Sequence, residues 1–433
     1  QLDFLNVVRG RIHTDPAMTD LIPIQGMRNA PHLDFAGQVK KLTGMPTFHA
    51  AKIPDVATAR HAVEAGLLDM VGMTRAHMAD PHVVKKIIEG REDDIRPCVG
   101  ATYCLDRIYE AGDALCIHNA ATGRELTMPH TIQPAEKKRK VVIVGAGPAG
   151  LEAARVAAER GHNVVVFEAQ PDPGGQIRLT AQSPRRREMI SIIDWRMAQC
   201  AARDVEFNFN RWAEAGDVID QKPDVVIIAT GGMPNTELFE TGKDSTHVVT
   251  SWDIIAGDVK PADSILIYDE SGDHAALQAA EVAANAGAKI EIMTPDRTFS
   301  ASVMAMNLVP YMRSLQDKDT TFTVARRLLG VELRGNKLEA RIGTDYSDHS
   351  DIQEYDQVVV NYGTLPLDEL YFDLKDLSSN GGSVDHDALI KGHTQNIVKN
   401  SGGEFQLFRI GDAVSARNTH AAIYDALRLL KDI

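Results

Sequence analysis

The sequence predicts an α/β protein in which a block of alternating strands and helices precedes two nucleotide-binding units of the Rossmann type. Three observations lead to this prediction. Short apolar runs alternate with helical patterns from residue 1 to about residue 92. A glycine-rich turn joins a strand to a helix at residues 145–150, and a segment at residues 263–296 repeats that layout.

Composition excludes several classes of protein. The chain has 433 residues, of which 44% are apolar and 24% charged, enough for two or three globular domains. A net charge of -14 argues against nucleic acid or an anionic membrane as a partner, since both attract basic faces. No run has the length of a membrane span, no signal-peptide pattern opens the chain, and four cysteines make no disulfide framework. We therefore expect a cytoplasmic protein.

The first 92 residues form a block of parallel βα units. Three such units are too few to close a (β/α)₈ barrel, which takes about 250 residues, so we expect further barrel strands upstream of residue 1. The expected strands are 3–10, 46–53 and 68–73, and the expected helices are 32–44, 55–66 and 80–90.

Residues 93–136 form a cysteine-containing segment and linker, with three of the four cysteines in RPCVGATYCLDRIYEAGDALCIHN. Zinc suits them poorly because a closed site needs four ligands and only His118 is near. Iron–sulfur clusters take thiolates in the cadence Cx2Cx2C with a distant fourth, which this stretch matches with Ala101 in the second position. Cys98, Cys104 and Cys116 could therefore hold a 3Fe-4S cluster, or a 4Fe-4S cluster with one non-cysteine corner. The alternative is three buried thiols without metal.

The glycine turn GAGPAG predicts a dinucleotide site in a domain formed by residues 137–255 and 402–433. Gly145 permits the tight turn, Gly147 lets the backbone approach a pyrophosphate, and Gly150 lets helix and strand pack closely. Pro148 and Ala149 open the helix, whose N-terminus faces the phosphates. Glu168 ends the next strand, where its carboxylate can accept hydrogen bonds from ribose hydroxyls. We expect an ADP-containing ligand.

A later strand-to-helix turn, IGDA, fits the other end of this ligand. Gly411 and Asp412 stand where two-dinucleotide flavoproteins meet the pyrophosphate or the ribityl chain.

The second nucleotide-binding domain, residues 256–401, has lost the fingerprint glycines. Ser271, Asp273 and Ala276 occupy their places, beside Asp269 and Glu270. Carboxylates around this turn oppose a pyrophosphate, and non-glycine residues obstruct the approach of the backbone. The domain is either vestigial or an atypical NAD(P)H site.

Taken together, the motifs GMTRAHMADP (72–81), the cysteine stretch, GAGPAG and IGDAVSARNTHAAIYDALR resemble the trimethylamine dehydrogenase / 2,4-dienoyl-CoA reductase family. The resemblance implies an old-yellow-enzyme-like (β/α)₈ barrel holding FMN, an iron–sulfur linker, and two nucleotide-binding domains of the glutathione-reductase type. More narrowly, CVGATYCLDRIYEAGDALCIHNAATGRE resembles the branch that demethylates dimethylglycine or N-methylproline (stachydrine) derivatives.

The resemblance also implies cofactor sites and partners. Residues expected around the FMN phosphate are Ala51, Lys52, Gly72, Met73, Thr74 and Arg75. Catalytic residues are expected in the upstream barrel strands and cannot be named. The GAGPAG site takes FAD or ADP. We expect a homo-oligomer that passes electrons to an electron-transferring flavoprotein or a ferredoxin-like acceptor.

Two other functions remain open at this stage. Family members that reduce enoyl-CoA or dienoyl-CoA substrates take electrons from NADPH, whereas amine dehydrogenases run in the opposite direction. The lost glycines favour oxidative N-demethylation. The other alternative is an electron-transfer subunit without a substrate pocket.

Overall fold

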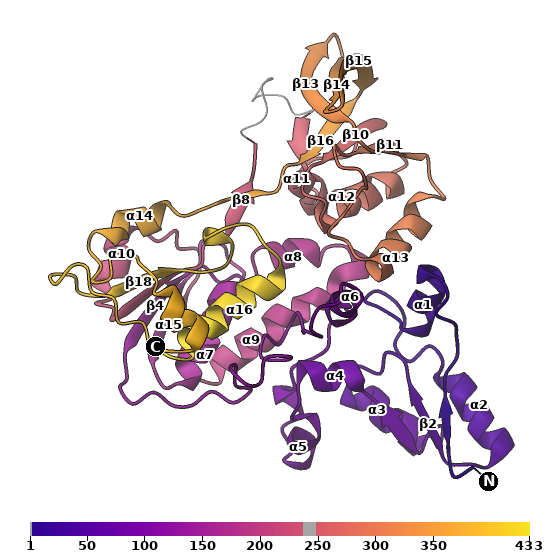
Figure 1. Cartoon of the computed structure of the whole chain (residues 1–433), viewed down its shortest axis with the longest axis horizontal. Helices are drawn as coiled ribbons and strands as arrows, with labels where there is room; N and C mark the ends of the chain where they lie inside the picture. The colour runs from indigo at the N-terminus through magenta and orange to yellow at the C-terminus, as the bar shows by residue number, and fades with distance from the viewer. Residues whose placement is uncertain (1, 237–247) are drawn as a thin grey trace. The chain divides into compact units, whose positions relative to one another are not determined.

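The computed structural model describes residues 2–236 and 248–433. The chain divides into two compact units. Unit 1 comprises residues 1–181, 185–232 and 366–433, and unit 2 comprises residues 182–184 and 233–365. Both are built from parallel sheets and helices (Figure 1), which confirms the predicted α/β class. The domain boundaries at residues 256 and 401 stay a prediction.

The N-terminal block of unit 1 is a three-stranded parallel sheet in the order β1-β2-β3. Its strands are β1 (Leu5–Val7), β2 (Thr47–Ala50) and β3 (Met70–Gly72), and its helices are α1 (Asp15–Leu21), α2 (Leu33–Thr43), α3 (Val56–Glu64), α4 (Thr74–Ala79) and α5 (Val83–Ile88). Helix α3 begins where the side chain of Asp55 accepts a hydrogen bond from the amide of Thr58. Buried apolar residues such as Leu33, Ala36 and Leu68 form the core of this block.

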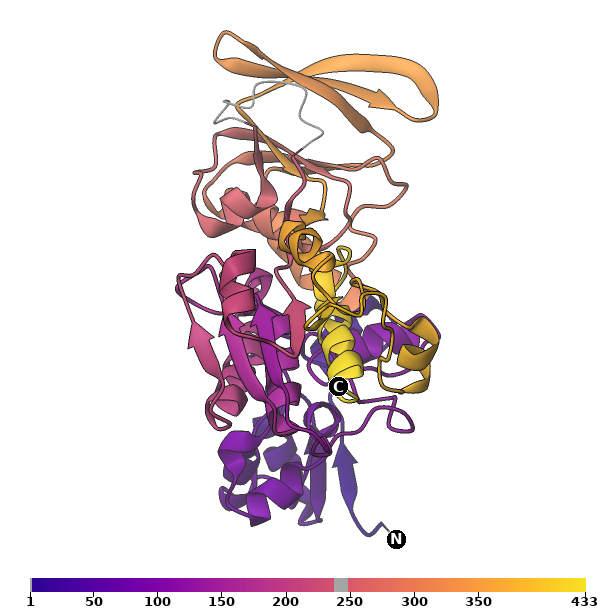
Figure 2. The ribbon, with the colours of Figure 1, turned by 90° about the vertical axis from the view of Figure 1, so that its left-hand side faces the viewer.

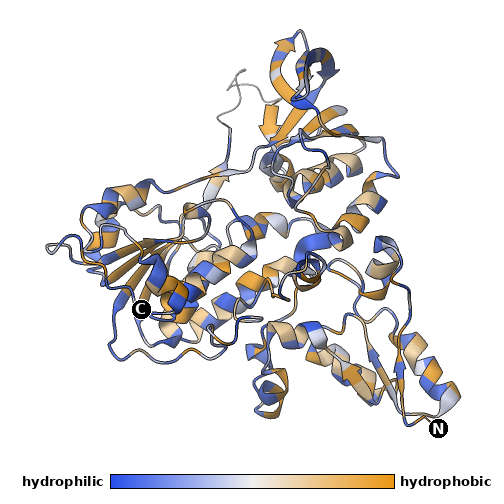
Figure 3. Ribbon diagram, viewed as in Figure 1, coloured by the Kyte–Doolittle hydropathy of each residue, from blue (hydrophilic) through white to orange (hydrophobic). Residues whose placement is uncertain are grey.

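The second sheet of unit 1 is parallel, in the order β18-β7-β4-β5-β6. Its strands are β4 (Lys140–Val144), β5 (Asn163–Phe167), β6 (Glu206–Asn208), β7 (Val225–Ile228) and β18 (Gln406–Arg409). The central strands are apolar along almost their whole length and orange in Figure 3, as expected of a sheet covered on both faces. Figure 1 shows helices α7 (Pro148–Glu159), α9 (Ser191–Ala201) and α16 (Thr419–Leu430) side by side.

Unit 2 repeats this arrangement with the strand order β12-β11-β10-β16-β9. These strands are β9 (Val248–Thr250), β10 (Ser264–Asp269), β11 (Lys289–Met293), β12 (Thr320–Thr323) and β16 (Gln357–Asn361), and β10 leads into helix α12 (His274–Asn285). As β4 lies between β5 and β7, so β10 lies between β11 and β16, and all these pairs are parallel.

An antiparallel sheet that the sequence analysis did not predict completes unit 2. It consists of β13 (Arg327–Arg334), β14 (Lys337–Thr344) and β15 (Ser347–Tyr355), the long curved orange ribbons of Figure 2. Leu338, Ala340 and Ile342 of β14 pack in one core cluster with Leu266 and Tyr268 of β10, so this sheet covers one face of the parallel sheet.

Shorter elements connect these parts. They are α6 (Tyr103–Tyr109), α8 (Gln176–Thr180), α10 (Ala215–Asp220), α11 (Ser251–Ala256), α13 (Ala305–Leu315), α14 (Glu369–Lys375), α15 (His386–Lys391), β8 (Gly232–Pro234), β17 (Thr364–Pro366) and the 3₁₀ turns at Glu92–Asp94, Pro184–Ile190 and Gly411–Ala413. Among the described residues, every helix is too short or too polar to span a bilayer.

Candidate functional site

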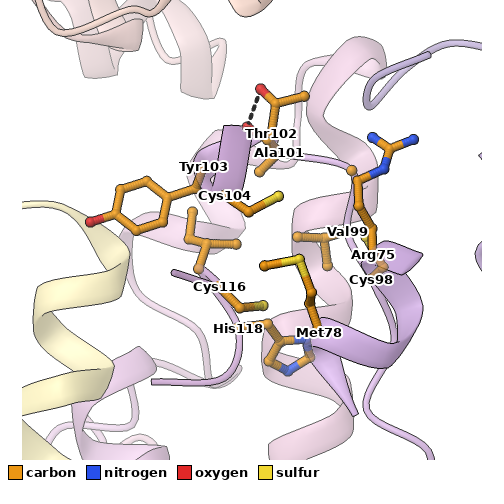
Figure 4. A pocket seen from close by; sticks show the side chains of 12 residues that line it. Arg75, Met78, Cys98, Val99, Ala101, Thr102, Tyr103, Cys104, Cys116 and His118 are labelled. Atoms are coloured by element: carbon orange, nitrogen blue, oxygen red, sulfur yellow. Dashed lines mark hydrogen bonds between the residues drawn. The ribbon is translucent and has the colours of Figure 1, made fainter. Parts of the chain in front are cut away.

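The three clustered cysteines lie around one hollow of unit 1. Cys98, Cys104 and Cys116 line it together with Met78 and the ring of His118. Cys104 lies on the short helix α6, which begins after Thr102 in the left-handed conformation (φ 56°). Figure 4 shows the sulfur atoms of Cys104 and Cys116 pointing into the hollow, with the side chain of Met78 reaching between them. Residues 18 positions apart in the sequence, Cys98 and Cys116, thus share one site.

The surroundings of these thiols are apolar. Burial raises the pKa of Cys116 to about 12, and the nearby Cys98 adds to the rise, whereas the backbone amides of His118 and Asn119 donate hydrogen bonds to the sulfur. Burial also raises the pKa of Cys104. As free thiols these two residues are protonated at neutral pH, so a metal centre would have to displace their protons. Amide donors to sulfur suit thiolates that hold an iron–sulfur cluster.

In residues 2–236 and 248–433, no group of three or more His, Cys, Asp and Glu side chains, the three cysteines included, is arranged to hold a metal ion. Ala101 lines the cysteine hollow and offers no donor to it through its methyl side chain. The thiol groups of the hollow are therefore those of three cysteines, with the Met78 side chain and the His118 ring beside them, and an iron–sulfur cluster at this place stays a prediction.

A second hollow lies at the ends of β2 and β3, with about 1080 Å³ of space not occupied by protein atoms, open solvent included. All six residues predicted for the FMN phosphate line it: Ala51, Lys52, Gly72, Met73, Thr74 and Arg75. Their shared position follows from topology, because parallel strands end at one edge of a sheet. Their role in binding FMN stays a prediction.

Two cations of this hollow have protein partners. The ammonium group of Lys52 is buried, donates to the carbonyl of Met27 and forms a 2.7 Å ion pair with Glu188. Arg75 donates from Nη2 to the carbonyl of Pro23 at 2.8 Å, while its buried Nη1 has no hydrogen-bond partner among the described residues. Arg75 is therefore better placed than Lys52 to bind an additional anion.

The two hollows share part of their lining. Arg75, Cys98 and Gly100 contribute to both. These three residues would therefore lie between a group bound at the ends of β2 and β3 and a group bound by the cysteines.

The structure gives two different reasons for the three glycines of the predicted dinucleotide turn. A Cβ on Gly145 (φ 104°) would lie 2.3 Å from the carbonyl oxygen of Ala229, and one on Gly150 would lie 1.9 Å from the carbonyl oxygen of Gly145. A Cβ on Gly147 would meet no atom of the described residues within 4 Å. Packing requires glycine at positions 145 and 150, whereas Gly147 leaves a space that the described residues do not fill. Pro148 and Ala149 open α7, whose N-cap makes no side-chain hydrogen bond.

Acidic groups flank this turn. Glu168 follows β5 and accepts hydrogen bonds from the amides of Ala146 (2.7 Å) and Gln170 (2.8 Å). Asp412 follows β18 and accepts a hydrogen bond of 3.1 Å from Gln176; burial raises its pKa. A Cβ on Gly411 would lie 2.9 Å from the Cβ of Ala149, so the two turns are in contact. The structure thus places all predicted dinucleotide residues together.

The corresponding turn of unit 2 is filled by its own carboxylate. Asp269 accepts hydrogen bonds from the amides of Ser271 (3.1 Å) and Gly272 (3.0 Å), and from the side chain of Asn361 (2.9 Å). Asp273 caps α12 by accepting a hydrogen bond of 2.7 Å from the amide of Ala275. The amides that bind phosphate in such turns are here engaged by carboxylates.

Two groups of residues beside the cysteines were missed in the sequence. One is His420 of α16, which contacts the backbone of Cys116. The other is a set of buried charges on α7 and α9, namely Glu152, Arg155 and Arg196. No spacing motif marks either group, because their members come from distant parts of the chain.

A family model described as pyridine nucleotide-disulphide oxidoreductase matches residues 139–424. The chain belongs to this family. Membership agrees with the Rossmann-type units and supports a flavin cofactor.

Two curated relatives and one solved structure extend the comparison. The chain is 68% identical over 432 residues to the probable N-methylproline demethylase of Rhizobium meliloti (strain 1021), covering 100% of this chain and 63% of that protein. It is 42% identical over 442 residues to the N,N-dimethylglycine/sarcosine dehydrogenase of Chromohalobacter salexigens, covering 100% and 64%. Histamine dehydrogenase from Rhizobium sp. 4-9 has the same fold, with a TM-score of 0.83, 24% identity, and coverage of 99% of this chain and 60% of that chain.

These comparisons confirm the resemblance to the trimethylamine dehydrogenase / 2,4-dienoyl-CoA reductase family and to its demethylase branch. The chain spans less than two thirds of the length of the two curated relatives.

Proposed function

We propose that this chain is part of an iron–sulfur flavoprotein dehydrogenase that oxidises an N-methylated amine or amino acid of the dimethylglycine or N-methylproline type. The names of the two curated relatives support this substrate class. Removal of two electrons and a proton from the N-methyl group gives an iminium. Water then adds to its carbon, and the products are formaldehyde and the demethylated amine.

FMN, when bound, supplies the two-electron acceptor for this oxidation. The hollow at the ends of β2 and β3 is its proposed site, within a barrel of which these strands form a part. There Arg75, whose Nη1 has no hydrogen-bond partner in the part of the chain that the structure describes, offers a permanent cation to a phosphate. The backbone of Gly72 to Thr74 lines the same hollow.

The observation that carries the proposal is the lining shared by the two hollows. Cys98, Cys104 and Cys116 would hold an iron–sulfur cluster, which supplies one-electron transfer when bound. Because Arg75, Cys98 and Gly100 line both hollows, electrons have a short route from one to the other. The proposed acceptor beyond the cysteines is an electron-transferring flavoprotein or a ferredoxin-like protein. The site at Gly145–Gly150 takes FAD or ADP.

The direction of electron flow is inferred from unit 2. Asp269 and Asp273 engage the amides around the turn that would otherwise face a pyrophosphate. A nicotinamide dinucleotide would have to displace a carboxylate that is 1% exposed. This arrangement favours oxidation of an amine over reduction by NAD(P)H.

One observation favours a second candidate, an NAD(P)H-dependent enoyl-CoA or dienoyl-CoA reductase. The matching family is named for pyridine nucleotides, and the match at residues 139–424 includes the parallel sheet of unit 2.

Anaerobic reduction of the purified holoprotein separates the two candidates. Flavin absorbance is followed after addition of dimethylglycine or N-methylproline to one sample and of NADPH or NADH to another, and formaldehyde is assayed. Bleaching and formaldehyde with the methylated amines, and no bleaching with either dinucleotide, is the expected result. Bleaching by a dinucleotide alone would show that the protein is a reductase.

A pair of cysteine variants tests the proposed electron route. Cys116→Ala is expected to lose iron and to lose amine-dependent reduction of the external acceptor, while the flavin is still bleached by amine. Cys200→Ala is the matched control, because Cys200 is fully buried on α9 and lines neither hollow. Equal iron content in the two variants would contradict the assignment of Cys116.

A further inference from the structure

A network of buried charges lies on α7 and α9. Glu152 receives hydrogen bonds from Arg155 (2.7 Å) and Arg196 (2.8 Å). The exposed fractions of these three side chains are 1%, 5% and 0%. Arg155 also pairs with Glu159 at 2.6 Å, whose side chain is 23% exposed. Within this group, two carboxylates balance two guanidinium groups.

A third guanidinium group, that of Arg96, is paired with no carboxylate in residues 2–236 and 248–433. It lies over the ring of Trp195, with its central carbon 4.2 Å from the ring centroid, and its buried Nε has no hydrogen-bond partner in the same residues. The nearby Asp80 is already paired with Lys86 at 2.6 Å.

These groups lie directly behind the wall of the cysteine hollow. Arg196 donates a hydrogen bond of 2.9 Å to the carbonyl of His118, whose ring lines the hollow. That ring meets Trp195 edge to face, with centroids 5.5 Å apart. Arg96 itself precedes Cys98 by two residues. The excess positive charge therefore lies behind the side of the hollow that His118 lines.

A buried charge without a counter-ion is costly, so this excess positive charge calls for an anion nearby. Of the groups that line the hollow, the three cysteines can become anions, as thiolates that hold a cluster. One-electron reduction makes such a cluster more negative by one charge, and a fixed cation stabilises the reduced form more than the oxidised form.

We propose that the buried charge network (Arg96, Glu152, Arg155 and Arg196) is the counter-charge of the cluster and raises its reduction potential, so that the cluster accepts electrons readily from the reduced flavin. This inference rests on the proposed function, since it requires a cluster at the three cysteines. In this proposal Arg96 acts through its charge on the cluster and does not contact the substrate.

The proposal predicts potential shifts of opposite sign for two variants. Arg96→Met removes a cation and is expected to lower the reduced-to-oxidised ratio of the cluster at a fixed potential about tenfold, a shift of about 59 mV for one electron. Glu152→Gln removes an anion and is expected to raise that ratio. Arg96→Lys keeps the charge and is expected to restore the ratio. Arg211→Met, at an arginine with a 57% exposed side chain, is the control.

The measurement is a redox titration of the holoprotein without substrate, followed by the EPR signal of the cluster, with iron and thermal stability determined for each variant. Shifts of opposite sign at equal iron content are the expected result. Unchanged potentials, shifts of the same sign, or loss of iron from both variants would overturn the proposal, because a purely structural role produces those outcomes. A wild-type holoprotein without iron would refute the proposed function itself.

Discussion

His420 of α16 donates a hydrogen bond of 2.8 Å from its ring Nδ1 to the main-chain oxygen of Cys116. The tautomer follows from the other ring nitrogen: Nε2 lies 3.0 Å from a guanidinium nitrogen of Arg124, which can only donate. Tyr103 stacks on the same imidazole, with centroids 5.0 Å apart, and Figure 4 shows its ring turned away from the cysteine hollow toward the yellow helix α16. The cysteine segment is thus attached to the helix that follows the Gly411 turn.

His420→Phe is expected to weaken cluster binding. The phenyl ring preserves stacking on Tyr103 but leaves the carbonyl of Cys116 without its donor. Loss of such an outer partner of a metal ligand costs about 10- to 100-fold in metal affinity. The measurement is the rate at which a chelator removes iron from the holoprotein.

The control is His162→Phe. His162 is also buried and bonds a backbone carbonyl, that of Ile433, at 3.1 Å, but it lies outside the cysteine hollow. Equal rates of iron loss in the two variants would show that the His420 contact does not support the cluster.

Alanine substitutions at two glycines of the nucleotide turn are expected to have different effects, one on nucleotide binding and the other on stability. Gly147→Ala adds a Cβ that meets no protein atom within 4 Å, at an ordinary φ of -73°, so the fold is retained while the methyl group obstructs a pyrophosphate. Gly150→Ala places a Cβ 1.9 Å from the carbonyl oxygen of Gly145, which forces α7 away from β4 and costs about 1–3 kcal/mol.

The measurements for these variants are the nucleotide released on denaturation and the thermal unfolding temperature. Gly216→Ala on α10 is the control, since its Cβ also meets no atom within 4 Å. A Gly147→Ala protein that retains its nucleotide would refute the placement of the pyrophosphate.

The sequence was sufficient to predict the parallel sheets and to name residues that lie together in each hollow. The apolar composition of strands such as 141–144 and 225–228 predicts that they are buried. Residues at the ends of neighbouring parallel strands, such as Lys52 and Arg75, lie close together because these ends share one edge of the sheet. Pairings between distant side chains were not predictable. Arg196 meets Glu152 across 44 positions, and His420 meets Cys116 across 304, with no periodic pattern to connect them.

The turn of unit 2 shows a different limit of sequence reasoning. The acidic residues there suggest repulsion of a phosphate, and that interpretation treats each carboxylate as a free charge. In the structure Asp269 folds back onto the amides of its own turn, so the anion-binding groups are occupied from within. Only the local backbone conformation reveals this.

Asp269→Asn is expected to change how stability depends on pH. Burial, with the nearby Asp273, raises the pKa of Asp269 from 3.8 to about 6. Between these values the folded protein binds more protons than the unfolded chain, so the free energy of unfolding of the wild type falls as pH rises, by about 3 kcal/mol in total. The variant lacks this component. Its stability relative to wild type should therefore increase from pH 4 to pH 6 and stay constant above.

Urea denaturation of both proteins at about pH 4 and about pH 7, with protection of β10 and β16 from proteolysis as the readout, measures this difference. Asp319→Asn, at an exposed aspartate of unit 2, is the control. A difference between Asp269→Asn and wild type that is independent of pH would contradict the burial of a titrating carboxylate at this turn.

Ala101→Cys is expected to complete the cysteine set. Ala101 lines the hollow formed by Cys98, Cys104 and Cys116, at the position where the Cx2Cx2C cadence has its second thiolate. A cluster held by three cysteines has one iron site without protein sulfur, which small ligands such as cyanide can reach, or lacks that iron altogether.

The fourth thiolate should raise the iron content toward four per chain if the wild type holds three. It should also abolish the effect of cyanide on the EPR spectrum and slow removal of iron by a chelator on the order of tenfold. Ala101→Ser is the control, because it adds a side chain of similar size without a thiolate. If the cysteine and serine variants respond alike to cyanide and to the chelator, the open corner of the cluster does not lie at residue 101.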